Sequence, residues 1–102
     1  MKRNKKDKLE IDLLSRSYLN SKRILNEYMD NIMNYPQSVL EYHRRNVYHM
    51  EYVAESLRQE ERLIIEKEVL EGQRGKWYRN YFSEPSYYRY RVSAYANFLR
   101  CL

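Results

Sequence analysis

The sequence contains very few of the residues that form tight turns, and it contains a single cysteine. Only two glycines and two prolines occur in 102 residues, whereas about 7% glycine and 5% proline are ordinary. This scarcity argues against many short strands joined by tight turns and favours long helices. Because Cys101 has no second cysteine with which to form an internal disulfide, we expect a reducing compartment, the cytoplasm.

Long apolar runs are also missing. No segment approaches the roughly 18 consecutive apolar residues of a membrane-spanning helix, and no apolar stretch follows the basic start as it does in a signal peptide. We therefore expect no membrane partner. A chain of this length seldom has enough surface to bury for two independent cores, so one folding unit is expected.

Acidic residues are scarce at both ends of the chain. The net charge is +5, and it divides into +4 over residues 1–8, −1 over 9–54, −3 over 55–71 and +5 over 73–102. Two basic ends around an acidic middle are expected if the ends meet a polyanion. Charged ends that only keep a small protein in solution would have the same pattern.

The apolar periodicity predicts three parts: a disordered basic arm over 1–8, a helical hairpin over 9–57 and further helices over 58–102. Pro36 should end the first helix near Asn34, and Ser38 should cap the second together with Glu41. Each helix has a seam with three- and four-residue steps, typical of an antiparallel hairpin or of a dimer. The seams are Ile11, Leu14, Tyr18, Ser21, Leu25, Tyr28 and Ile32, then Leu40, His43, Val47, Met50, Ala54 and Leu57.

The last part of the chain has the pattern of helix, turn and helix. A third helix should run from Glu60 to Leu70 and end at Gly72, and a short helix should cover 74–81. Ser83 is a suitable N-cap for a last helix that reaches about Leu99, with Pro85 tolerated in its first turn. We therefore predict an all-α fold in which a helical hairpin precedes a helix-turn-helix.

The last helix has two different faces. One is apolar and predicts contact with Trp77, Leu63 and Ile64; it consists of Tyr87, Tyr90, Ala94 and Phe98. The other carries Ser86, Arg89 and Ser93, with Tyr88 and Arg91 at its edge. Arginine can bridge guanine or pair with phosphate, so this face is a candidate DNA surface. The alternative is that these residues are ordinary solvated surface.

The stretch from Glu60 to Leu99 resembles the region of bacterial sigma factors that reads the promoter −35 element, and more closely the related ArpU-type phage regulators. The resemblance rests on Leu57, Glu60-Glu61-Arg62-Leu63-Ile64-Ile65, Leu70-Glu71-Gly72, Trp77-Tyr78 and the segment from Phe82 to Ala94. It implies a helix-turn-helix capped by Ser83, with DNA contacts from Glu84, Ser86, Tyr88, Arg89 and Ser93. Tyr78 stands where the family usually has a small residue.

No catalytic or metal-binding pattern emerges. His43 and His49 lie six residues apart, which is not the i, i+4 spacing of a helical zinc site, so an interface histidine is the expected role of His43. The run Glu60, Glu61, Glu66, Glu68 and Glu71 lacks an accompanying nucleophile or phosphate-binding glycine loop and is expected to be solvated helix surface. We expect neither an enzyme nor a cofactor.

Two functions follow as hypotheses. The first is a transcriptional regulator that binds double-stranded DNA through the last helix, assisted by phosphate contacts from the 1–8 arm and from Arg74, Lys76 and Arg79. The second is a helical interaction module that docks RNA polymerase, or its own copy through residues 9–57, without binding DNA.

Overall fold

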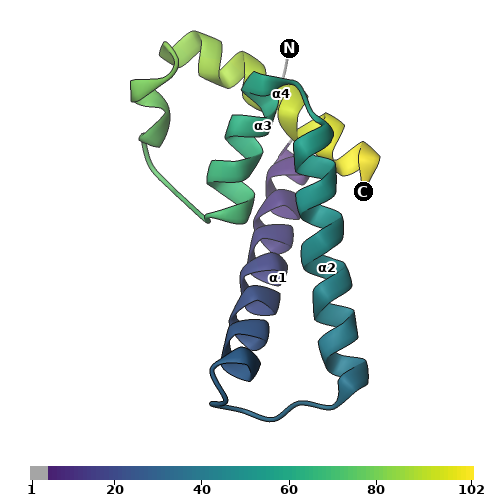
Figure 1. Ribbon diagram of the computed structural model, residues 1–102. Helices are drawn as coiled ribbons and strands as arrows, with labels where there is room; N and C mark the ends of the chain where they lie inside the picture. Colours follow the sequence, from purple (N-terminus) through teal and green to yellow (C-terminus); the bar gives the residue numbers. More distant parts are fainter. Residues whose placement is uncertain (1–4) are drawn as a thin grey trace.

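The computed structural model describes residues 5–102, and this part of the chain is helical without any strand, as predicted. Two long helices form a hairpin, and the shorter elements gather at the end of the hairpin where α1 begins and α2 ends (Figure 1). In chain order the elements are α1 (Lys5–Met29), α2 (Gln37–Ser56), α3 (Gln59–Ile65), the π-helical η1 (Glu66–Leu70), the 3₁₀ turn η2 (Trp77–Asn80) and α4 (Glu84–Cys101).

Most positions of the predicted seams face the inside of the hairpin, but Ile32 lies beyond the end of α1 and is exposed. Ile11, Tyr18 and Ser21 are buried on α1, and Leu40, Val47, Met50 and Ala54 are buried on α2. The two helices run antiparallel, side by side (Figure 1). Of the two arrangements that the seams allowed, the hairpin within one chain is therefore the one observed.

The ends of α1 differ from the prediction. Residues 5–8 are helical instead of disordered, and residues 1–4 of the predicted arm lie outside the described residues. The helix ends at Met29 and not near Asn34, because Asn31 adopts a left-handed conformation with φ of 58°. The Ile32 N–H then donates to the Glu27 carbonyl at 2.8 Å, which closes the helix in a Schellman turn. Asn31, and not Pro36, is the terminating residue.

The predicted capping box at the start of α2 is also wrong. Pro36 occupies the N-cap position, and no side chain caps the helix. Its carbonyl accepts from the Val39 and Leu40 N–H groups at 3.1 and 3.2 Å. Ser38 therefore lies exposed within the first turn, where its hydroxyl is not the cap.

Two further breaks divide the helices of the C-terminal half. Leu57 and Arg58 are extended, with ψ of 163° and 155°, so α2 and α3 are separate helices. Gly72 has a φ of 67° and ends η1, which confirms the predicted glycine stop. The short helix predicted over 74–81 is reduced to η2.

The hairpin and the C-terminal elements share one core. Residues of α1, α2, α3, η1, η2 and α4 form a single buried cluster. A buried hydrogen bond of 2.9 Å from the Ser15 hydroxyl to the Val69 carbonyl fastens α1 to η1. Within the described part of the chain, no helix is both long and apolar enough to cross a membrane.

The Ser15 contact gives a direct test of this packing. Ser15→Ala leaves the buried Val69 carbonyl without its side-chain donor, so we expect a loss of about 1 to 2 kcal/mol in the free energy of unfolding, measured in urea. Ser38→Ala is the matched control, and its expected effect is below about 0.5 kcal/mol because the hydroxyl is exposed. A loss near 1 kcal/mol at Ser38, the usual cost of removing an N-cap, would contradict the described helix start.

Candidate nucleic-acid interface

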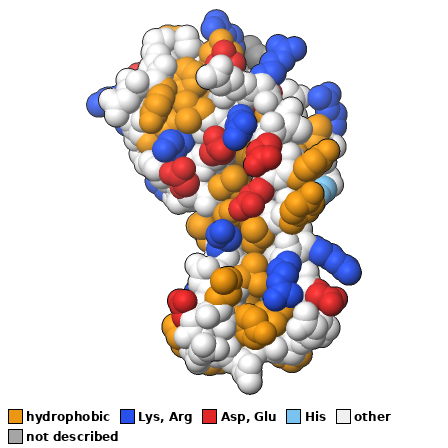
Figure 2. Space-filling model, in the orientation of Figure 1, with side chains coloured by type: hydrophobic (Ala, Val, Ile, Leu, Met, Phe, Trp, Pro, Cys, Tyr) orange, Lys and Arg blue, Asp and Glu red, His pale blue; other side chains and the backbone are white. Residues whose placement is uncertain are grey.

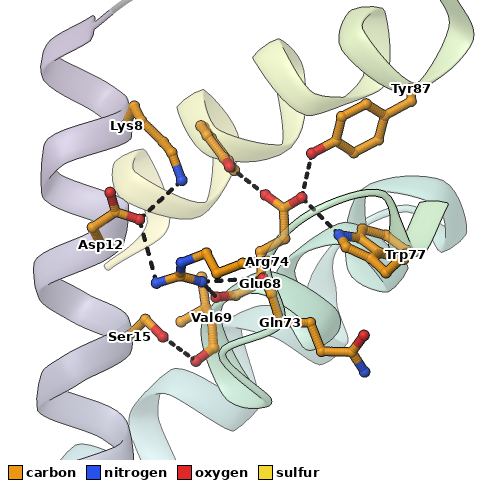
Figure 3. A network of polar contacts seen from close by, with 10 residues as sticks. Lys8, Asp12, Ser15, Glu68, Val69, Gln73, Arg74, Trp77 and Tyr87 are labelled. Carbon is orange, nitrogen blue, oxygen red and sulfur yellow. Dashed lines mark hydrogen bonds and ion pairs between the residues drawn. The ribbon is translucent and has the colours of Figure 1, made fainter. Parts of the chain in front are cut away.

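A buried carboxylate organises the C-terminal half of the molecule. The Glu68 side chain projects from η1 and is only 6% exposed. Its Oε2 accepts from the Trp77 indole N–H at 2.9 Å and from the Tyr87 hydroxyl, and its Oε1 accepts from the Tyr95 hydroxyl. Figure 3 shows Trp77 and Tyr87 converging on this carboxylate from different elements. Glu68 thus joins η1 to η2 and to two turns of α4.

Arg91 lies beside this network and not in open solvent. Its guanidinium is 5.1 Å from the centre of the Tyr95 ring and 5.8 Å from that of Tyr88. Burial opposes its charge, but the attraction of Tyr95, Tyr87 and Glu68 outweighs burial and raises the pKa of Arg91. Burial also raises the pKa of Tyr87 and of Tyr95, and the Glu68 carboxylate adds to both shifts, so both hydroxyls stay protonated donors at neutral pH.

Stacked aromatic rings attach η2 to α4. The Tyr78 and Tyr87 rings are nearly parallel, with centroids 3.8 Å apart, and Trp77 meets Tyr87 edge-on at 5.9 Å. Tyr78 therefore fills the contact between η2 and the first turns of α4. Such ring contacts stabilise the structure by more than the burial of the rings alone. They therefore hold η2 against α4, although η2 is only one turn long.

The start of α4 agrees with the sequence prediction. The Ser83 hydroxyl accepts from the Ser86 N–H at 3.3 Å, and Pro85 lies in the first turn. Phe82 precedes the cap and packs against Tyr90, with ring centroids 5.6 Å apart. Ser83 consequently fixes the direction in which α4 leaves the turn, and its hydroxyl is already engaged with the backbone.

The opposite side of α4 faces solvent. Pro85, Arg89, Ala96 and Arg100 are exposed, and Ser93 is half-buried between them. This side forms one wall of a groove of about 1100 Å³, whose other wall comes from the α2–α3 junction at Leu57, Arg58, Glu60 and Glu61. Glu61 is engaged, since Asn97 donates to its two carboxylate oxygens at 3.1 and 3.2 Å.

The predicted DNA-binding residues fall into two groups. Lys76, Arg79, Glu84 and Arg89 are exposed, and Ser86 and Ser93 are half-buried on the outward side of α4. The others are used within the protein. Arg74 donates to the Glu68 carbonyl at 3.3 Å and lies 3.6 Å from Asp12, which also pairs with Lys8 (Figure 3). Tyr88 and Arg91 border a smaller cleft of about 390 Å³ against the start of α1, and Ser83 is the cap.

The prediction of a solvated glutamate surface is wrong for Glu61 and Glu68, which are 7% and 6% exposed. A signal for their burial was present. Glu61, Ile64, Ile65 and Glu68 have the i, i+3, i+4, i+7 spacing of one helix stripe, so the two buried isoleucines imply that both glutamates face inward. The prediction also missed Tyr95 on the inner face of α4. It named Tyr90 there, but Tyr95 is buried and Tyr90 is half-buried.

The histidines take the expected structural places. His43 Nδ1 lies 2.7 Å from the Ser21 hydroxyl inside the hairpin, and Ser21 also accepts from the Asn46 amide at 2.8 Å. His49 Nε2 lies 3.2 Å from the Leu102 carbonyl, so the end of α4 is fastened to α2. Among residues 5–102, no three His, Cys, Asp or Glu side chains come together as a metal site would require.

The Glu68 network predicts a large effect for a nearly isosteric change. Glu68→Gln replaces one accepting oxygen by an amide nitrogen, so three buried donors can no longer all be satisfied. We expect a loss of about 2 to 3 kcal/mol in the free energy of unfolding, followed through the fluorescence of Trp77.

Glu71→Gln is the control for this change, because Glu71 is exposed and its contact with Lys67 is a surface pair. Its expected effect is below about 0.5 kcal/mol. Equal losses for the two variants would mean that the Glu68 carboxylate does not hold η1, η2 and α4 together.

Comparisons with known proteins add no identification. No protein-family model, no curated protein and no solved structure matches this chain. The function is therefore argued from the arrangement of its own residues.

Proposed function

We propose that this protein binds double-stranded DNA through the outward side of α4 and acts as a transcriptional regulator of the helix-turn-helix kind. The observation that carries the proposal is the combination on α4 of two exposed arginines, Arg89 and Arg100, with small side chains between them. Glu84 is the only acidic residue from Gln73 to Leu102. A helix surface with this composition suits the negative potential of a DNA groove.

The shape of α4 supports the same function. An α-helix with its side chains is about 10–12 Å wide, close to the width of the major groove. Between the arginines, Ser93 and Ala96 are short, so base edges can approach the helix closely. Arg89 suits bidentate contact with guanine, and Ser86 and Ser93 supply hydroxyls for phosphate or base edges.

Cations on neighbouring elements extend this surface. Lys76 and Arg79 are exposed on the turn that packs against the start of α4. They are assigned to phosphates, which would set the position of the helix without reading sequence. Arg74 and Arg91 are left out of this assignment because they are engaged with Asp12 and with the Glu68 network.

The rigidity of α4 favours a reading helix over a surface that happens to be basic. The inner side of α4 is held by two tyrosine hydroxyls on one carboxylate, by the Tyr78 ring and by the Ser83 cap. A helix held in this way keeps its outward side chains in a fixed register, which sequence-selective contacts require.

The second candidate is a helical interaction module that docks RNA polymerase or its own copy. Its support is the internal position of Arg91, which removes one cation from the proposed DNA surface, together with the exposed rings of Tyr42, Tyr48 and Tyr52 on α2. Aromatic side chains are enriched in protein interfaces. In this candidate the α2 face is the docking surface and the outward side of α4 does not bind DNA.

The DNA-binding proposal is tested with fluorescence anisotropy, first on a pool of random duplexes and then on duplexes selected from it. With the four exposed cations Lys76, Arg79, Arg89 and Arg100 all on phosphates of the random pool, the affinity for the pool should fall by about a hundredfold between 50 and 200 mM salt. Arg89→Ala should lower the preference for selected over random duplexes by about tenfold, the loss of one bidentate base contact. Lys76→Ala should weaken both kinds of duplex equally.

Arg23→Ala is the charge-matched control, because Arg23 lies on α1 and pairs with Glu27. It should leave the preference for selected duplexes unchanged. Absence of binding to any duplex at low salt would overturn the proposal, and equal effects of Arg89→Ala on selected and random duplexes would remove Arg89 from its reading role.

A further inference from the structure

The second helix carries another seam on the side that the hairpin does not use. Glu41, Arg45, Tyr48, Tyr52 and Glu55 follow one another at steps of four, three, four and three residues, and all five are exposed. We call them the outer seam of α2. Heptad spacing of this kind places side chains on one line along a helix that pairs with another helix. No element of the described chain covers this line.

The centre of the outer seam is aromatic. Tyr48 and Tyr52 are 70% and 63% exposed, and their rings stack with centroids 6.3 Å apart. Figure 2 shows hydrophobic side chains gathered at the edge of the molecule beside a histidine. Two large rings held side by side in water form a preordered apolar surface, and tyrosine is among the residues that contribute most to protein interfaces.

Opposite charges flank the tyrosine pair of the outer seam. Arg45 lies one turn before the tyrosine pair, and Glu55 lies one turn after it. Within residues 5–102, neither side chain takes part in an ion pair. With Arg45 before the tyrosine pair and Glu55 after it, the part of the seam over residues 45–55 is complementary to its own antiparallel copy.

We propose that two copies of this chain associate through their outer seams, with the two α2 helices antiparallel. The two-fold axis lies between the two helices, at the level of Met50 along α2. In this register Tyr48 meets Tyr52 of the second copy, and Arg45 meets Glu55 of the second copy. The two-fold axis repeats each pair, as an isologous interface requires.

Other registers and orientations lack this complementarity. A parallel pair would place Arg45 against Arg45 and Glu55 against Glu55, which is repulsive. An antiparallel pair shifted toward the start of the helix would set Arg45 against Tyr48 and Glu41 against Tyr52, and would leave Glu55 without a cation. The charges and the tyrosine pair together therefore favour this register.

The dimer would determine the symmetry of the DNA site, and this step rests on the proposed function. His49 fastens the end of α4 to α2 at the Leu102 carbonyl. The two-fold axis between the two α2 helices therefore also relates the two α4 helices. Symmetric reading helices require a DNA site with two inverted half-sites.

The dimer is tested without DNA, by sedimentation equilibrium of the full chain at low salt, so its failure is separate from that of the proposed function. We expect a monomer–dimer equilibrium. Arg45→Glu alone and Glu55→Arg alone should each weaken dimerisation by at least about tenfold, because each creates two like-charge pairs across the interface. The double variant R45E/E55R should return the affinity to within about threefold of the original, since the charges are again opposite.

Lys22→Glu makes the same change in net charge as Arg45→Glu, at a residue that is exposed on α1. It should leave dimerisation unaltered. Circular dichroism of each variant reports whether it is folded, and exposed positions are expected to tolerate these changes. Tyr48→Ala should weaken the dimer while the monomer keeps its helicity. A native chain that stays monomeric at every concentration, or single variants that the double variant does not rescue, would overturn the proposal.

Discussion

The burial of one carboxylate constrains most of the C-terminal half. A charged group taken out of water must be surrounded by donors, and Glu68 meets this requirement with Trp77, Tyr87 and Tyr95 from two other elements. The donors lie far apart in sequence, so the carboxylate can be satisfied only when η2 and α4 are both in place. The same requirement explains why an η2 of one turn has a defined position.

This anchoring gives α4 two sides with different roles. Arg91 and Arg89 are only two residues apart, yet Arg91 is half-buried beside Tyr88 and Tyr95, whereas Arg89 lies over the Tyr90 ring and is exposed. The inner side fixes the helix, and the outer side is free to contact a partner. The hairpin adds a third surface, because its inner seam is buried between α1 and α2 while the outer seam of α2 stays uncovered. The proposed DNA contact and the proposed self-association therefore occupy separate faces.

Much of the fold could be predicted from periodicity, since the seams, the all-helical class, the Gly72 stop and the Ser83 cap follow from local patterns. The failures have physical causes. Asn31 ends α1 in the left-handed conformation that asparagine tolerates, whereas the prediction took the later Pro36 as the stop. Pro36 instead occupies the N-cap of α2, which leaves Ser38 inside the first turn. Acidic residues were assumed to be solvated, although the spacing of Glu61 and Glu68 with Ile64 and Ile65 placed them inward. Which arginines of α4 are engaged depended on that buried carboxylate and could not be read from sequence.

In the proposed function, the outward side of α4 contacts DNA while its inner side stays anchored. The most direct measurement is an amide chemical-shift titration by NMR, with a duplex selected from random DNA as the probe. We expect progressive shifts at Ser86, Arg89, Ser93 and Ala96, with the indole N–H of Trp77 unmoved. Shifts confined to α2, or a moved Trp77 indole with no change on the outward side of α4, would contradict it.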